Sequence, residues 1–441
     1  MTTFWCEHAE LGTGPVPGVR ISVDAGRITA VERAPADPGD TRLAGVVFPG
    51  FANAHSHAFH RALRGRTHDS SGTFWTWRKR MYAVAARLDP DSYLTLARAV
   101  YAEMALAGVT CVGEFHYLHH PAGGGRYDDP NAMSEALVQA AADAGVRLTV
   151  LDACYLAGGL DAGGHHELDA VQMRFADIDA DDWAARVSFL PERPGLRIGA
   201  AVHSVRAVPA EQLGQVAAAA RGRPLHVHVS EQAAENDATR AFYGHTPVAL
   251  LRDRGALGPD TTVVHATHVT GDDVSALGAT GTSVCACPST EADLADGVGP
   301  FRRLQDAGSP LCLGSDQHAL TDLLGEARLL EADERLVSGE RGRFRPAELV
   351  DALTVAGHRA LGWPDAGRIA PGQRADLDAV RLDTPRTAGC APDQVVMAAG
   401  AADVHTVVVD GRVVVSDGQH VLGDVGRLLR DAIEPLWEEA T

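Results

Sequence analysis

The chain has 441 residues, of which 45% are hydrophobic, and a formal net charge of −19. Its length allows one large domain with a smaller one beside it, and its composition is that of an ordinary globular protein. The negative charge argues against a nucleic-acid or membrane partner, so an anionic substrate would need a local cluster of arginines.

The N-terminal stretch MTTFWCEHAELGTG lacks the basic segment and apolar core of a secretory signal. No apolar stretch reaches the roughly 18–20 residues that a membrane span requires. The 7 cysteines are scattered and odd in number, which favours reduced thiols over a disulfide framework. These features predict a cytoplasmic protein.

Residues 1–46 contain short strand-like runs, GVRISV and RITAVE, separated by turn residues. From residue 47 to 366, apolar runs alternate with helical stretches such as 131–145 and 209–221. The strand candidates are GVVFPGFAN, TCVGEFHYL, RLTVLDACYL, LRIGAAVHS, PLHVHVSE, TTVVHATHV, TSVCACPS and PLCLGSDQH. This alternation predicts an α/β fold, a (β/α)8 barrel of the TIM type, with a doubly wound open sheet as the alternative.

After residue 366 the pattern returns to short strands and turns. The run VHTVVVDGRVVVSDGQ contains a hairpin signal, Asp410-Gly411, between two valine-rich segments. We expect both chain ends, residues 1–46 and 367–425, to form one small β-sandwich domain. A C-terminal helix is expected over residues 426–441.

Polar residues gather at the ends of the candidate barrel strands, where barrels of this type carry their chemistry. They are His55 and His57, His116 and Tyr117, His203 and Arg206, His226, His228 and Glu231, His265 and His268, and Asp316 and His318. Alternate residues of a strand point the same way, so His55 and His57 can share a cation. Histidine nitrogen and carboxylate oxygen are suitable ligands for Zn²⁺ or a similar divalent metal.

The motifs PGFANAHSHAF, HVHVSEQ, VVHATH and GSDQH, in this order, resemble the deaminase branch of the amidohydrolase superfamily. Within that branch FWTWRKRMY, EFHYLHH and HSVRAV are similar to the formimidoylglutamate deiminases of histidine degradation. The resemblance implies a homodimeric hydrolase that acts on the C–N bond of a linear amidine. Its small acidic substrate would be N-formimidoyl-L-glutamate, and its products N-formyl-L-glutamate and ammonia.

The same resemblance implies the metal ligands, which are His55, His57, His228 and Asp316. His226 is a rival ligand, although a packing role is favoured because His228 has the family's spacing to Glu231. The only lysine is Lys79, in a helical region, so a carboxylated lysine cannot bridge two metals on a middle strand. One divalent metal, Zn²⁺, is therefore favoured.

Three residues are implied as catalytic groups. Asp316 would accept the proton of the attacking water, and His265 would orient that water and stabilise the tetrahedral centre. Glu231 would carry protons to the departing nitrogen. A divalent metal supports such chemistry by lowering the pKa of a water from ~16 towards ~7.

Substrate contacts are implied for His60, Arg78, Tyr117 and Arg206, because arginine binds carboxylate with two parallel hydrogen bonds. The structural alternatives are a solvated helix arginine for Arg78 and core packing for Tyr117. His60 stands where the family often carries glutamine. The assignment of a glutamate-derived substrate is therefore weakest at this position.

Other interpretations stay open. The substrate could be a formimidoyl-aspartate, a guanidino acid or a nucleobase derivative, and the remote alternative is a catalytically silent binding protein. Cys285 and Cys287 fit buried thiols better than a metal site, because they have no partner pair. The remaining histidines that attract notice are expected to lie behind the site or on the surface; they are His119, His120, His165, His166 and His318.

Overall fold

The computed structural model describes residues 2–68, 72 and 74–438. Within these residues one parallel sheet has the strand order β5-β6-β7-β10-β11-β12-β13-β14, and a bridge between Ser56 and Asp316 joins its two edges. The strands are β5 (Phe51–Ser56), β6 (Val109–His116), β7 (Arg147–Cys154), β10 (Leu196–Ser204), β11 (Leu225–Val229), β12 (Thr261–His265), β13 (Ser283–Ala286) and β14 (Leu311–Leu313). The predicted barrel is thereby confirmed.

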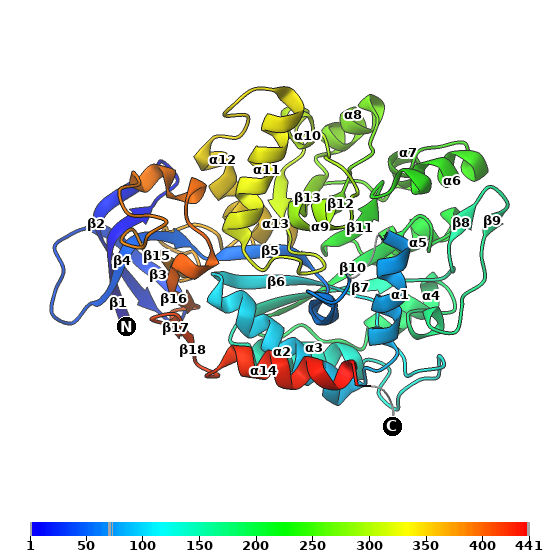
Figure 1. Ribbon diagram of the computed structural model, residues 1–441, viewed down its shortest axis with the longest axis horizontal. Coiled ribbons are helices and arrows are strands. Elements are labelled where there is room, and N and C mark those ends of the chain that lie inside the picture. The colour runs from blue at the N-terminus through cyan, green and yellow to red at the C-terminus, as the bar shows by residue number, and fades with distance from the viewer. Residues whose placement is uncertain (1, 69–71, 73, 439–441) are drawn as a thin grey trace.

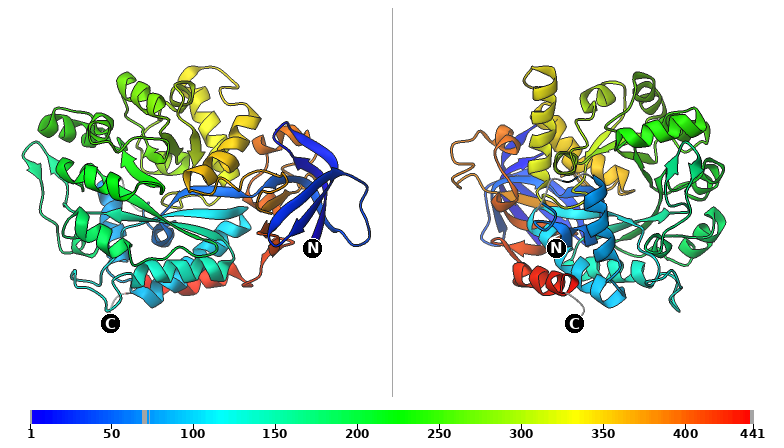
Figure 2. Two further views of the ribbon diagram at one scale, coloured as in Figure 1. Left: turned by 180° about the vertical axis from the view of Figure 1, so that it is seen from behind. Right: turned by 45° about the vertical axis from the view of Figure 1, so that its right-hand side comes forward.

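The barrel strands are apolar on both faces because helices cover their outer side (Figures 1 and 2). The helices of this part of the chain are α1 (Phe74–Ala85), α2 (Pro90–Leu106), α3 (Ala132–Ala144), α4 (Ala180–Val187), α5 (Ala210–Ala219), α6 (Ala233–Tyr243), α7 (Pro247–Asp253), α8 (Gly271–Thr280), α9 (Pro288–Asp293), α10 (Phe301–Asp306), α11 (Leu323–Ser338), α12 (Pro346–Asp351) and α13 (Gly357–Ala360). No helix among the described residues has the length and apolar character that crossing a bilayer requires.

A second sheet combines both chain ends at one end of the molecule, with the order β18-β17-β16-β15-β4-β1-β2-β3 (Figure 1). Its strands are β1 (Thr2–Glu10), β2 (Pro15–Asp24), β3 (Arg27–Arg33), β4 (Thr41–Pro49), β15 (Leu377–Val380), β16 (Val404–Val409), β17 (Arg412–Ser416) and β18 (Gln419–His420). A further short hairpin, β8 (Leu160–Asp161) with β9 (Gly164–His165), lies beyond β7. The hairpin predicted at Asp410-Gly411 connects β16 and β17, and both turn residues have positive φ, 46° and 75°.

The first predicted barrel strand, residues 45–53, is wrong as a single element. β4 ends at Pro49 in the small sheet, and the barrel begins at Phe51 in β5. Gly50 allows the chain to pass between the sheets, because a Cβ there would lie 2.4 Å from the Thr110 side chain and 2.8 Å from Asp376 Cβ. The exact domain limits at residues 46, 366 and 425 stay a prediction.

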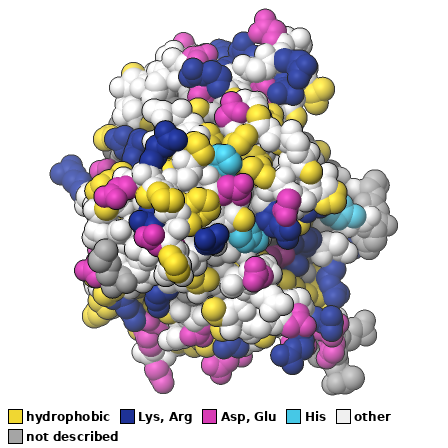
Figure 3. Space-filling model, turned by 90° about the vertical axis from the view of Figure 1, so that its left-hand side faces the viewer, with side chains coloured by type: hydrophobic (Ala, Val, Ile, Leu, Met, Phe, Trp, Pro, Cys, Tyr) yellow, Lys and Arg dark blue, Asp and Glu magenta, His cyan; other side chains and the backbone are white. Residues whose placement is uncertain are grey.

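The C-terminal helix α14 (Val425–Ile433) lies along α2 beneath the barrel (Figures 1 and 2). Its predicted last residues, 439–441, fall outside the described part of the chain. Figure 3 views the molecule from the small-sheet end and shows acidic and basic side chains interspersed on that face. Charge of one sign does not gather there.

Candidate active site

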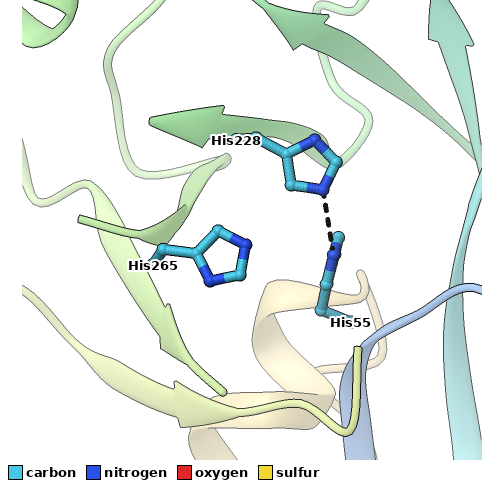
Figure 4. Close-up of side chains that lie close together, drawn as sticks. All are labelled: His55, His228 and His265. Carbon is cyan, nitrogen blue, oxygen red and sulfur yellow. Dashed lines mark hydrogen bonds between the residues drawn. The ribbon is translucent and has the colours of Figure 1, made fainter. Parts of the chain in front are cut away.

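The four predicted metal ligands lie together where the barrel strands end. The Nε2 atom of His228, on β11, is 3.1 Å from Nε2 of His55 and 3.3 Å from Nε2 of His57, at the end of β5. Oδ1 of Asp316, which follows β14, is 3.5 Å from Nε2 of His55 and 3.4 Å from Nε2 of His57. The ligand atoms thus face one another, as Figure 4 shows for His55 and His228.

This donor set fits a divalent cation of the zinc type. Nδ1 of His57 donates to the carbonyl of Phe115 at 2.8 Å, and Nδ1 of His228 donates to the carbonyl of His203 at 2.8 Å. With the proton on Nδ1, each Nε2 presents a lone pair to the other ligands, which a cation between them would satisfy. Burial lowers the pKa of both histidines, which keeps them neutral and able to coordinate.

His226 and Lys79 lie apart from this cluster. Nε2 of His226 donates to the carbonyl of Ala360 at 3.0 Å, and its side chain is buried one layer deeper in the barrel than His228. This arrangement agrees with the packing role favoured for His226. Lys79 is exposed on α1, so the cluster contains no lysine that could bridge two cations.

His265, the last residue of β12, lies between carboxylates. Its Nε2 is 3.8 Å from Oδ2 of Asp316 and 3.8 Å from Oε1 of Glu231, and its Nδ1 is 3.3 Å from Oε1 of Glu291. Burial lowers the pKa of His265, but the three carboxylates outweigh it and raise this pKa to about 10. Burial also raises the pKa of Glu231, although the charges of His265 and Arg206 oppose this shift, so two groups with shifted pKa values lie side by side. In Figure 4 the ring of His265 faces the space between His55 and His228.

The backbone takes left-handed conformations at several of these positions. The φ angles are 52° at Ser230, 69° at His265 and 43° at Asp316. Such conformations cost a non-glycine residue of order 1 kcal/mol and concentrate at functional sites, where surrounding structure enforces them. Here they turn the chain at the strand ends and bring side chains to the barrel mouth.

A pocket opens onto the cluster, and all four predicted substrate residues line it: His60, Arg78, Tyr117 and Arg206. Arg206 is half-buried, with Nε 3.7 Å from Oε1 of Glu235 and Nη2 3.9 Å from Oε2 of Glu231. Burial by itself would lower the pKa of Arg206, but the two carboxylates have the larger effect. The pKa is therefore raised above its usual value, and the guanidinium keeps its charge.

Arg78, on α1, is the second cation of the pocket. Its guanidinium lies 4.7 Å from the ring centre of Trp75 and 5.3 Å from that of Tyr82. Cation–π contacts of this kind orient an arginine without consuming its hydrogen-bond donors. Arg78 is therefore a half-buried pocket residue rather than the freely solvated helix arginine of the structural alternative.

His60 is neutral in this environment. Its Nε2 lies 2.8 Å from the hydroxyl of Tyr117, and its ring packs 4.5 Å from His57 and 5.1 Å from Trp77, measured between ring centres. Burial lowers the pKa of His60 well below its usual value, so it contributes a hydrogen-bonding group and not a positive charge. Among the described residues its Nδ1 has no hydrogen-bond partner.

Sequence reasoning gave no role to several residues that complete the site. His203 lines the pocket between the rings of Tyr117, at 5.3 Å, and Tyr155, at 4.6 Å. Its place at a strand end was the available signal. Glu235 and Glu291 left no such signal, because each acts on a partner brought close only by folding.

The remaining histidines and cysteines occupy varied places. His318 is buried beside the ligand strands, 3.1 Å from Oγ of Ser56 and 3.2 Å from Oγ of Ser315, while His166 is exposed. Nε2 of His119 and of His120 each bond a backbone carbonyl, and His165 bonds the hydroxyl of Tyr243 at 2.7 Å. Cys285 and Cys287 are buried free thiols, as expected.

The sequence and the fold of this chain are similar to those of known proteins. The model of the amidohydrolase family matches residues 46–414. The chain is 36% identical to formimidoylglutamate deiminase of Pseudomonas aeruginosa, covering 95% of this chain and 96% of that protein. It is also 30% identical to 8-oxoguanine deaminase of the same organism, covering 83% and 84%. Among solved structures, an amidohydrolase from Brucella melitensis superposes with a TM-score of 0.92 at 31% identity, covering 99% of this chain and 100% of that one.

Proposed function

Since this chain belongs to the amidohydrolase family and is a hydrolase of the deaminase type, we propose that its substrate is N-formimidoyl-L-glutamate. The products are N-formyl-L-glutamate and ammonia, and the cofactor is one Zn²⁺ held by His55, His57, His228 and Asp316. We also propose that the enzyme works as a cytoplasmic homodimer in histidine degradation.

The observation that carries the proposal is the pair of arginines in the pocket. Arg78 and Arg206 line the same pocket as the candidate ligands in a chain whose net charge is −19. A substrate with two carboxylates on a short aliphatic chain matches two guanidinium groups, since each can take a carboxylate with paired hydrogen bonds. Tyr117 and His60 add neutral hydrogen-bonding groups to the same pocket.

In the proposed reaction, water adds to the imino carbon of HN=CH–NH–R and the terminal nitrogen leaves as ammonia. A bound divalent cation supplies Lewis acidity and makes water more acidic. Asp316 accepts a proton from the attacking water, and His265 orients that water and stabilises the charge that develops at the carbon. Glu231 delivers protons to the terminal nitrogen, so the C–N bond breaks as a C=O bond forms.

A second candidate is a related deamination of a different substrate. The similarity to 8-oxoguanine deaminase makes a heterocycle worth testing, and an N-formimidoyl-aspartate or a guanidino acid would also suit the arginines. A flat uncharged heterocycle would offer no carboxylate to the guanidinium groups of Arg78 and Arg206, which disfavours that class.

The test is an ammonia-release assay on the metal-loaded protein. N-formimidoyl-L-glutamate, N-formimidoyl-L-aspartate, a guanidino acid and 8-oxoguanine are compared at equal concentrations. We expect kcat/KM for the glutamate derivative to exceed that for each other compound by at least about tenfold. A faster reaction with the heterocycle would replace our substrate, and no release from any compound would favour a silent binding protein.

A further inference from the structure

Cys287 belongs to a second group of potential ligands beside the predicted metal cluster. The ligand atoms of His265, Cys287 and Asp316 all lie within 4.8 Å of one another, and the three side chains are buried. They come from three neighbouring strands, since His265 ends β12, Cys287 follows β13 by one residue and Asp316 follows β14. The group is thus built by the barrel itself.

The chain leaves room for this thiol next to Asp316. Gly314 has no side chain, and a Cβ at that position would lie 3.0 Å from Sγ of Cys287. The sulfur therefore lies against the segment that carries Asp316. A thiolate, an imidazole and a carboxylate together suit a thiophilic divalent cation such as Zn²⁺ or Cd²⁺.

Charge around the group also favours a cation. Glu231 and Glu291 both lie within 4 Å of His265, in addition to Asp316. A comparable buried group, His116, His119 and Asp152, lacks this excess because the guanidinium of Arg186 lies 2.9 Å from the carboxylate of Asp152. The additional carboxylates distinguish the Cys287 group from the group of His116, His119 and Asp152.

We propose that His265, Cys287 and Asp316 form an inhibitory site for a second, thiophilic divalent cation. As the cation binds, the thiol of Cys287 and Nε2 of His265 each release a proton to solvent and coordinate through sulfur and nitrogen. The inference rests on the proposed function, because inhibition follows from the loss of His265 and Asp316 as groups that handle water. Catalysis itself does not use Cys287.

The binding test uses the protein already loaded with one equivalent of Zn²⁺. Co²⁺ is added, and the near-ultraviolet thiolate-to-Co²⁺ charge-transfer band is recorded beside metal stoichiometry. We expect a second bound equivalent and the band in the wild type and in Cys285→Ser, a buried thiol two residues away. Both signals should be lost in Cys287→Ser and Cys287→Ala, while the first equivalent stays bound.

The activity test adds excess Zn²⁺ or Mg²⁺ to the same proteins during ammonia release. Zn²⁺ should inhibit the wild type and Cys285→Ser, with inhibition at least about tenfold weaker in the Cys287 variants, and hard Mg²⁺ should not inhibit. Loss of the band in Cys285→Ser, or equal inhibition in all variants, would overturn the site. If the band follows Cys287 but the wild type releases no ammonia, the proposed substrate fails and the cation site stands.

Discussion

Arg206 is a half-buried cation whose ion pairs are incomplete. The shortest distances from its guanidinium to Glu231 and Glu235 are 3.9 Å and 3.7 Å, beyond the range of good hydrogen bonds. Its donors are thus held in place electrostatically but not used up. A substrate carboxylate could complete them, which makes Arg206 the residue on which substrate affinity should depend most.

Replacing Arg206 by methionine keeps much of the side-chain volume and removes the charge. We expect KM for N-formimidoyl-L-glutamate to rise about 10- to 100-fold, because a hydrogen bond to a charged group contributes roughly 1.5–3 kcal/mol. Steady-state kinetics and metal analysis measure the effect, and Arg240→Met, an exposed arginine on α6, is the control. Metal loss in Arg206→Met would show that this arginine supports the cluster instead.

Glu231→Gln keeps the shape of the side chain but cannot carry a proton. We expect a protein that binds its metal normally and whose kcat falls about 10²- to 10⁴-fold, the usual contribution of a general acid or base. Ammonia release and metal content are measured on the same preparation. Turnover near that of the wild type would refute the proton-transfer role.

The four residues that lie together as candidate ligands could be named from the sequence through its resemblance to the deaminase motifs, whereas strand spacing alone indicated only the His55-x-His57 pair. Their partners could not. Glu291 reaches His265 from helix α9, 26 positions along the chain, and Glu235 reaches Arg206 only after α6 has packed. Neither the neutral state of His60 nor its bond to Tyr117 follows from residue order, since both depend on burial.

At the scale of elements, strands buried on both sides were predicted most closely. The apolar run LRIGAAVHS coincides with β10, and the helix expected over 209–221 is α5, Ala210–Ala219. β1 was missed, because its sequence TTFWCEHAE mixes polar and apolar residues and its pairing with β2 and β4 decides its structure. Pairing between distant segments is the information that local patterns lack.

Glu326 connects two elements through a buried carboxyl group. On α11 it accepts hydrogen bonds from the backbone NH and the hydroxyl of Ser289, in α9. Burial raises the pKa of Glu326 to about 8, although the bonds from Ser289 oppose this shift. In the unfolded chain a glutamate titrates near 4.3, so between these pH values the folded protein holds the extra proton.

Folding stability should therefore decline as pH rises from about 4.3 to about 8, because over this range unfolding must release the proton that Glu326 holds in the folded protein. Glu326→Gln cannot ionise, so its Tm relative to wild type should increase from about pH 5.5 to about pH 9, with each pKa unit equivalent to about 1.4 kcal/mol. Thermal unfolding at both pH values measures this difference. Glu340→Gln, an exposed glutamate beyond the same helix, should show no such trend; an identical trend would refute the assignment.

On the scale of the whole molecule, the two ends of the barrel serve different purposes. The carboxyl ends of the strands carry the candidate active site, whereas the amino ends contact the small sheet. There Arg147, the first residue of β7, pairs with Asp376, and both side chains are 1% exposed. Nη1 of Arg147 also lies 3.3 Å from Asp410 in the β16–β17 hairpin. One guanidinium therefore joins the barrel both to Asp376, which precedes β15, and to this hairpin.

Arg147→Met should separate stability from catalysis. It leaves Asp376 buried without its charge partner, which costs about 3–5 kcal/mol, and Tm should fall accordingly. Metal content and kcat/KM at low temperature should stay close to wild type, because the pocket lies at the opposite end of the barrel. Arg193→Met, which breaks the partly exposed pair with Glu135, should change Tm little.

Adding Asp376→Asn to Arg147→Met removes the unpaired buried charge and should recover part of the loss in Tm. An unchanged Tm with reduced kcat/KM would instead mean that the Arg147–Asp376 contact affects the geometry of the active site. The small sheet would then take part in catalysis.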